Sequence, residues 1–368
     1  MKGSFRLGTA FGIGVFVHWT FAILILFIVF TSYRAGQDAE QILWSVLFIL
    51  SIFVTVFLHE LGHALAAKRY NIGTRDITLL PIGGLARLEK IPEEPKEELV
   101  VALAGPAVNI MIAIIVGLFI SFPSNADDAA AIMGEGINPS NFMLYFFMVN
   151  IWLSIFNMIP AFPMDGGRVL RALLSMGMGR IKATNIAARI GQLVAIGFVF
   201  AGFYVNPFLI FIGLFIILGA QGELTMTQTT HFLRGYTISD ILMKQYETLD
   251  IHATLGDAVD KILNGPYKSF IVTEDGVCKA TLSRDEIIKA LAEKGKQVSI
   301  REVMNTNMLS FELRTPIDEV YARMNEAGQE IAVITERGQF TGVVDTENIM
   351  EFIMIRNAVN RSSSSSMA

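Results

Sequence analysis

The segment His59-Glu60-Leu61-Gly62-His63 contains the residues whose types and spacing most clearly indicate chemistry. On an α-helix, positions i and i+4 lie on one face, so His59 and His63 can bind one zinc ion together. Glu60 then lies beside the metal and can act as a general base toward a metal-bound water. The alternative is a chance occurrence of this pattern in a helix that ends at a membrane interface.

A catalytic zinc ion takes three protein ligands and keeps one position open for water. Asp165 is the best candidate for the third ligand, because the prolines and glycines around it break a helix and let a carboxylate turn inward. Its alternative role is a turn or a helix cap. His18, beside Trp19, could also be a ligand, but we interpret it as an interfacial or helix-bonded histidine.

The composition predicts a membrane domain followed by a soluble domain. Of the 368 residues, 17% are charged, whereas soluble domains have about 25%. The deficit falls in the first 230 residues or so, and a polar remainder follows from about Tyr236. The net charge of −5 gives no reason to expect nucleic-acid binding. Cys278 is the single cysteine, so neither an intrachain disulfide nor a cysteine-based zinc motif exists.

Long apolar segments predict a multi-pass α-helical membrane domain with about six transmembrane helices, each near the ~20 residues that a span needs. A small β-hairpin is expected between the second and third spans, around Gly83-Gly84. The first span lacks a small-residue cleavage site, so we expect it to be retained. The predicted spans are residues 13–31, 42–67, 99–122, 142–159, 186–205 and 208–224.

The loops indicate how this membrane domain is oriented. Lys and Arg are concentrated in loops 68–96 and 160–184, whereas Arg34 is the only basic residue in the opposite loops. By the positive-inside rule, both basic loops, the N-terminus and the C-terminal domain lie in the cytoplasm. We therefore predict a multi-pass protein of the cell membrane, with the zinc motif inside the bilayer near its cytoplasmic face.

These residues together resemble the site-2 protease family of intramembrane zinc metalloproteases, over residues 10–225. The resemblance rests on the HELGH motif at 59–63, Pro81-Ile82-Gly83-Gly84, Gly105-Pro106 with Asn109, and the NxxPxxPxDGGR pattern at 157–168. It implies one Zn²⁺ per chain held by His59, His63 and Asp165, with Glu60 activating water. It also implies that Asn157 helps to hold the scissile carbonyl or its oxyanion. We interpret Gly105, Pro106 and Asn109 as helix-packing residues without a catalytic role.

The resemblance further implies cleavage within a transmembrane segment of a single-pass, membrane-anchored regulatory protein, that is, regulated intramembrane proteolysis. Because a helix hides its peptide bonds, such a substrate must unwind locally. We hypothesise that an edge of the hairpin captures the extended substrate by strand addition. The alternative is a surface hairpin that does not contact substrate. The candidate contact residues are Ile82, Gly83, Gly84 and Leu85.

The C-terminal half repeats with a period of about 62 residues, and it resembles a tandem pair of α/β CBS domains. Residues 237–242 match 299–304, and residues 271–276 match 333–338. The expected domains are therefore a transmembrane metalloprotease domain at 1–225, a linker at 226–236, CBS repeats at 237–295 and 296–356, and a disordered tail at 357–368.

Many CBS pairs bind adenine nucleotides through a Ser or Thr followed three residues later by Asp. Here the corresponding pairs are Ser283 with Glu286 and Asp345 with Asn348, and both depart from that pattern. Two interpretations stay open. The pair is either a nucleotide sensor that modulates the protease, or a module for packing, homodimerisation or protein docking.

Two other functions compete with an intramembrane protease. One is a transporter or channel gated by the CBS pair, with the histidines and Asp165 as an ion path. The other is an inactive, protease-like scaffold. Glu60 discriminates among them, because hydrolysis needs a general base beside the metal and an ion path does not.

Overall fold

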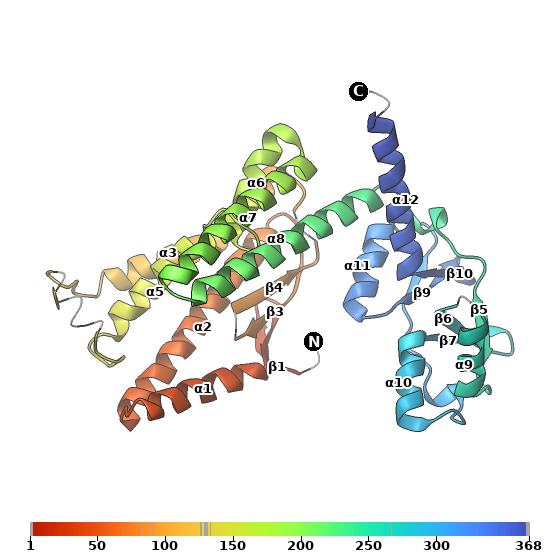
Figure 1. The fold of residues 1–368 in the computed structure, drawn as a ribbon, viewed down its shortest axis with the longest axis horizontal. Coiled ribbons are helices and arrows are strands. Elements are labelled where there is room, and N and C mark those ends of the chain that lie inside the picture. The colour runs from red at the N-terminus through yellow and green to blue at the C-terminus, as the bar shows by residue number, and fades with distance from the viewer. Residues whose placement is uncertain are drawn as a thin grey trace. The chain divides into compact units, whose positions relative to one another are not determined.

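The computed structural model describes residues 3–81, 83–90, 92–125, 127–128, 132, 134–265 and 267–365. The chain divides into two compact units, Met1–Thr225 and Met226–Ala368, and the boundary falls inside helix α8 (Figure 1). Helices form most of the first unit. They are α1 (Thr20–Arg34), α2 (Ala39–Lys68), α3 (Pro95–Gly117), α5 (Phe142–Asn157), α6 (Asp165–Met178), α7 (Arg180–Tyr204) and α8 (Phe208–Leu233).

Local sequence signals explain where the central helices begin. Asp38 caps α2 by accepting a hydrogen bond from the Gln41 amide, and the Gln41 side chain accepts one from the Asp38 amide in return. Pro95 starts α3, because its fixed φ suits the first helical position and its missing N–H costs nothing there. These two helices pack closely against each other, since a Cβ atom on Gly62 would lie 2.9 Å from the Ala104 carbonyl oxygen.

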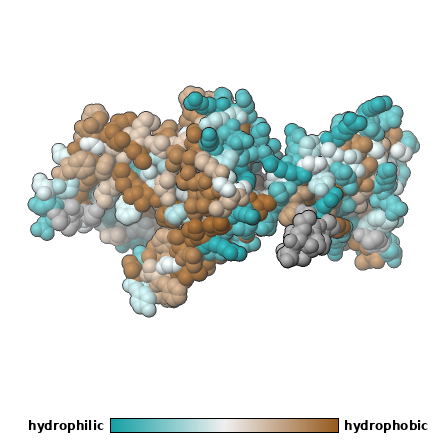
Figure 2. All heavy atoms as spheres, turned by 90° about the horizontal axis from the view of Figure 1, so that it is seen from above, coloured by the Kyte–Doolittle hydropathy of each residue, from teal (hydrophilic) through white to brown (hydrophobic). Residues whose placement is uncertain are grey.

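Four helices in the described part of the chain, α2, α3, α7 and α8, are long and apolar enough to cross a membrane. Helices α1 and α5 are apolar but shorter, with 15 and 16 residues. The chain is therefore a membrane protein, whereas the predicted number of about six spans stays a prediction. Figure 2 shows hydrophobic side chains gathered over the first unit, which exposes large apolar residues such as Phe119, Phe203 and Leu218.

The first unit also contains a four-stranded sheet in the order β1-β2-β3-β4, with bounds Ser4–Ala10, Ile13–His18, Thr74–Leu80 and Gly83–Leu88. Strands β3 and β4 are antiparallel, and β2 joins β3 in parallel. Strands β1 and β2 were not expected from the sequence.

The predicted first span was wrong over residues 13–18, which form strand β2 and not a helix. This segment is rich in β-branched and aromatic residues, which favour strands. Phe11 and Gly12 before it have φ angles of 52° and 87°, as a tight hairpin turn requires. The turn pairs the segment with β1, and the following helix α1 begins only at Thr20.

The second unit contains two similar three-stranded sheets, as the sequence repeat predicted. The first repeat comprises β5 (Glu247–Asp250), α9 (Leu255–Asn264), β6 (Ser269–Glu274), β7 (Val277–Ser283) and α10 (Arg284–Lys294). The second comprises β8 (Ser310–Glu312), α11 (Ile317–Ala327), β9 (Ile331–Glu336), β10 (Gln339–Asp345) and α12 (Thr346–Ser365). In each sheet the central strand, β6 or β9, pairs in parallel with the strand before it and antiparallel with the strand after it.

The two repeats exchange their leading segments. Ile238 and Ile241 pack into the core of the second repeat, whereas Ile300 packs into the core of the first. The exchange joins the repeats into one module, so the expected boundaries 237–295 and 296–356 cut across both hydrophobic cores. Helix α12 continues through residues 357–365, for which the sequence predicted disorder, because buried Ile349 and Ile353 anchor its start.

Candidate active site

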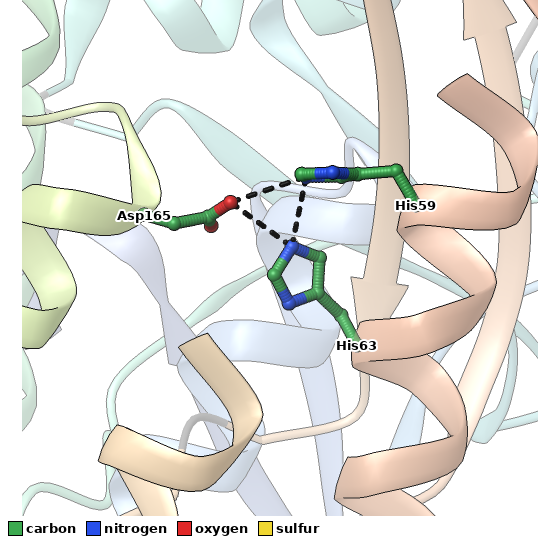
Figure 3. A group of neighbouring side chains, drawn as sticks. All are labelled: His59, His63 and Asp165. Carbon is green, nitrogen blue, oxygen red and sulfur yellow. Dashed lines mark hydrogen bonds and ion pairs between the residues drawn. The ribbon is translucent and has the colours of Figure 1, made fainter. Parts of the chain in front are cut away.

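Helix α2 positions the two histidines of the motif on one buried face. His59 and His63 are each 6% exposed, and both rings face the N-terminus of α6, where Asp165 lies (Figure 3). Asp165 Oδ2 lies 3.1 Å from Nε2 of each histidine, and the two Nε2 atoms are 3.1 Å apart. The three side chains that the sequence selected as ligands therefore converge from elements more than 100 residues apart.

Helix α3 orients both imidazole rings. His59 Nδ1 lies 3.1 Å from the Asn109 side-chain oxygen, and His63 Nδ1 lies 2.7 Å from the Val101 carbonyl oxygen. Both oxygens are acceptors, so each Nδ1 carries the proton and each Nε2 directs a lone pair toward Asp165. Asn109 thus contacts a ligand, which the sequence analysis missed. A buried asparagine in an apolar span was the available signal.

Gly105 on α3 leaves space for the ligands. An added Cβ atom would lie 2.2 Å from His63 Nε2 and 2.7 Å from His59 Nε2, which no real contact permits. Its role is therefore more specific than the helix packing that the sequence suggested. The neighbouring Pro106 contributes its carbonyl oxygen to a hydrogen bond from the Ser154 hydroxyl of α5, at 3.4 Å.

Asp165 reaches the histidines because the chain breaks and restarts just before it. Helix α5 ends at Asn157, and α6 begins at Asp165 itself, after a short turn. Gly166 and Gly167 allow that turn to pack tightly, since a Cβ atom on Gly166 would lie 2.3 Å from the Ile159 carbonyl oxygen. Asp165 is buried, and the sequence correctly predicted the break that turns it inward.

Within the described residues, one cluster of His, Cys, Asp and Glu side chains could hold a metal ion, and it consists of His59, His63 and Asp165. The geometry fits zinc. A tetrahedral ion with ligands at about 2.0–2.1 Å holds those ligand atoms about 3.3 Å apart, close to the 3.1 Å observed. A cation between two imidazole lone pairs and a carboxylate would stabilise this arrangement.

Glu60 follows the candidate ligand His59 on α2, and its side chain faces strand β4. Its Oε2 accepts a hydrogen bond from the Ala86 amide at 2.9 Å. Gly84 allows this approach, because a Cβ atom there would lie 2.6 Å from Glu60 Cγ. Strand β4 is an edge strand of the sheet, and the Ala86 N–H points away from its partner β3. The outward-facing Ala86 amide of this edge strand is therefore occupied by the Glu60 carboxylate.

The remaining candidates of the membrane unit have more varied surroundings. Asn157 ends α5, and its amide nitrogen donates to the Leu153 carbonyl at 3.0 Å. Gly83 and Leu85 belong to β4, while Ile82 lies outside the described residues. His18 ends β2, with Nδ1 2.8 Å from the Thr20 hydroxyl, and it is not a member of the metal-binding cluster.

The nucleotide candidates of the second unit act as helix caps. Ser283 caps α10, where its hydroxyl accepts from the Glu286 amide and the Glu286 carboxylate accepts from the Ser283 amide. Asp345 accepts a hydrogen bond from the Asn348 amide at the start of α12.

Carboxylates surround these caps. Burial raises the pKa of Asp345, and Glu347 and Glu351 raise it further. Burial also raises the pKa of Glu330, as do Asp285, Glu286 and Asp345. Nearby carboxylates therefore add to burial in raising these two pKa values, whereas Lys268 lowers that of Glu330.

Known protein families match both units of the chain. Residues 47–201 match peptidase family M50, and residues 238–293 and 300–355 each match the CBS domain. The chain is 33% identical to zinc metalloprotease MJ0392 of Methanocaldococcus jannaschii, over 96% of this chain and 97% of that protein. It also resembles the solved structure of a site-2 protease from the same organism, with 36% identity and a TM-score of 0.44, over 60% of this chain and 95% of the other.

Proposed function

The chain belongs to peptidase family M50, and from this premise we propose that it is an intramembrane zinc endopeptidase that cleaves a transmembrane segment of a single-pass, membrane-anchored regulatory protein. One observation supports the proposal above all. Two imidazoles and a distant carboxylate converge on one point, with Glu60 beside them, in a unit built of apolar helices. A metal centre with an adjacent glutamate is the arrangement that metal-assisted hydrolysis requires.

Each residue of the site has its own role in the proposed reaction. When bound, zinc acts as a Lewis acid and lowers the pKa of water to about 7. His59, His63 and Asp165 would hold the ion, and Asn109 keeps His59 in the tautomer that binds it. Glu60 accepts the proton of the attacking water and delivers it to the leaving amine. Asn157, at the end of α5, polarises the scissile carbonyl through its amide in this proposal.

In this proposal the substrate enters as an extended strand along the edge strand β4, beside Glu60. Support comes from the Ala86 amide, which points away from β3 and toward Glu60. A strand paired there would have its backbone next to the general base, and strand addition to an edge is a common mode of peptide recognition. Gly83, Gly84 and Leu85 lie along this edge.

The distribution of basic residues places the N-terminus, this edge and the CBS pair on the cytoplasmic side in the proposal. Water then reaches the metal from the cytoplasm. The CBS pair modulates cleavage through α8, the helix that connects it to the membrane unit. We propose that it also serves as a homodimerisation surface, since its two repeats already exchange segments within one chain.

Replacing Glu60 with Gln tests the proposed function. Glutamine has the same shape but cannot accept the proton, so cleavage should fall by about 100- to 10,000-fold. Bound zinc should stay at one ion per chain, because Glu60 is not one of the three ligands. The measurement combines metal analysis of the purified full-length chain with mass spectrometry of fragments from candidate single-pass substrates in liposomes.

Glu293→Gln on α10 is the matched control, since it makes the same chemical change on an exposed surface of the soluble unit. Wild-type cleavage by Glu60→Gln would contradict the role of the base. A wild-type chain that binds no zinc would contradict the peptidase itself. Ion flux through liposomes without zinc would instead favour the CBS-gated channel.

A further inference from the structure

A second buried polar cluster lies in the membrane unit, apart from the three ligands. Its centre is Arg171 on α6, whose side chain is 0% exposed. The guanidinium donates to Glu98 of α3 through Nε at 2.8 Å and through Nη2, and to Glu223 of α8 through Nη1 at 2.5 Å. Arg180 of α7 lies 3.4 Å from the other Glu98 oxygen. Four helices therefore meet at this ion network.

Such a network is a poor source of stability. The free energy needed to remove charged groups from water offsets much of their mutual attraction. Apolar side chains of similar volume often stabilise a protein more. What a guanidinium that donates to two carboxylates offers instead is a defined geometry, since its planar donors fix both partners in distance and angle. The contacts of Arg171 indicate that the network defines the position of α6 relative to α3.

Glu98 belongs to the same helix that orients both imidazoles. It lies one turn before Val101, whose carbonyl accepts from His63, and Asn109 and Gly105 follow on the same helix. Helix α3 is therefore the reference against which His59 and His63 are held. A residue of α6 that binds Glu98 therefore also fixes the position of α6 relative to His59 and His63.

Arg171 connects both α6 and the turn before it to this network. It lies less than two turns after Asp165, the first residue of α6. Its guanidinium also lies over the ring of Phe162, 5.0 Å from the centroid, in the turn that leads into Asp165. Phe162 is fully buried, so the guanidinium and the ring constrain each other.

We propose that Arg171 is a positioning residue for the metal ligand Asp165, with Glu98 and Glu223 as its anchors. This proposal rests on the zinc site of the proposed function. Through Glu98 the network fixes the position of α6 relative to α3, the helix that orients His59 and His63. Through Glu223 it also holds α6 against α8. Without it, Asp165 loses its fixed distance to the two Nε2 atoms.

The test measures zinc affinity by competition with a chelating dye, on the full-length chain in detergent. Arg171→Gln and Glu98→Gln should each weaken zinc binding by about 10- to 100-fold, the usual effect of losing a residue that orients a ligand. Their double variant should lose little more than either one, because both remove the same contact. Arg171→Lys should retain part of the affinity, since it keeps the charge but not the planar donors that contact Glu98 and Glu223 together.

Two further measurements separate positioning from general stability. The visible spectrum of the cobalt-substituted protein should change in the Arg171 variants, because it reports the ligand geometry. The unfolding temperature of the metal-free chain shows whether each variant is folded. Lys261→Gln, which breaks an ion pair with Glu247 in the soluble unit, is the matched control and should keep the wild-type zinc affinity and spectrum.

Folded Arg171→Lys and Glu98→Gln proteins with wild-type zinc affinity and cobalt spectra would overturn the proposal. If Arg171→Gln does not fold, the lysine variant and Glu98→Gln decide. A wild-type chain that binds no zinc would end both this proposal and the proposed function. A wild-type chain that binds zinc and cleaves substrate, with unchanged affinity in the Arg171 variants, would end this proposal alone.

Discussion

Two residues that shape the metal centre, Gly105 and Asn109, carry no ligand atom. Asn109 sets the tautomer of His59, and Gly105 leaves the volume in which the three ligand atoms meet. Both lie on α3, so the helix beside the motif contributes as much to the geometry as the motif helix α2. At this scale, sequence reasoning identified the groups that bind and overlooked the groups that make binding geometrically feasible.

Gly105→Ala should weaken zinc binding by at least 10- to 100-fold, because its methyl group would collide with both Nε2 atoms and displace the rings. The measurement is zinc affinity by dye competition. Gly197→Ala is a suitable control, since that glycine also lies in an apolar helix and a Cβ atom there meets nothing within 4 Å. Equal zinc affinity of Gly105→Ala and the wild type would show that the ligands bind in another arrangement.

At the scale of elements, the sheet and α2 together form the proposed substrate edge. Strand β4 lies at the end of the sheet, and Glu60 of α2 binds the Ala86 amide on its unpaired side. Along an edge strand, N–H and C=O groups point outward at every second residue. A proline scan of β4 would confuse two effects, since proline at Ala86 also removes the hydrogen bond to Glu60.

Ester-for-amide replacement in the substrate avoids that difficulty. If the substrate adds to β4 as a strand, esters should slow cleavage at every second position near the cleavage site and have little effect between them. Each lost hydrogen bond is worth about 0.5–1.5 kcal/mol, so the decrease in kcat/KM should be about 2- to 12-fold. Esters placed outside the paired segment provide the control, and a scan without alternation would contradict strand addition.

At the scale of the whole molecule, the CBS pair has a group of carboxylates near the caps of α10 and α12. Ser283 and Asp345 already cap α10 and α12, and the pKa values of Asp345 and Glu330 are raised first by burial and then by nearby carboxylates. A phosphate bound there would add further negative charge to this region. These contacts favour packing, docking or dimerisation over nucleotide sensing.

We therefore expect isothermal titration of the full-length chain with AMP and with ATP to give no binding heat at neutral pH. The same titrations with the Glu330→Gln variant test the physical reason, since removing one carboxylate reduces the repulsion. Injections into buffer alone supply the baseline. Binding heat from the wild-type chain with either nucleotide would establish the sensor interpretation instead.

The sequence by itself predicted the candidate ligands that lie together in the fold, the candidate general base and the division into a membrane and a soluble part. Each of these depends on local spacing or on composition: the i, i+4 histidines, the glutamate between them, and long apolar runs. The repeat of about 62 residues likewise predicted two similar sheets, because each copy encodes its own strands and helices.

Only the tertiary structure decided how these parts come together. Gly105 and Arg171 contact partners far along the chain and leave no local pattern, and for Asn109 the sequence offers only an asparagine in an apolar span, without its partner His59. Residues 13–18 form a strand because β1 and β3 pair with them, although their apolar character suggested a span. The hydrophobicity of a segment can be read from that segment alone. Strand pairing and the convergence of site residues depend on which distant segments the fold brings next to it.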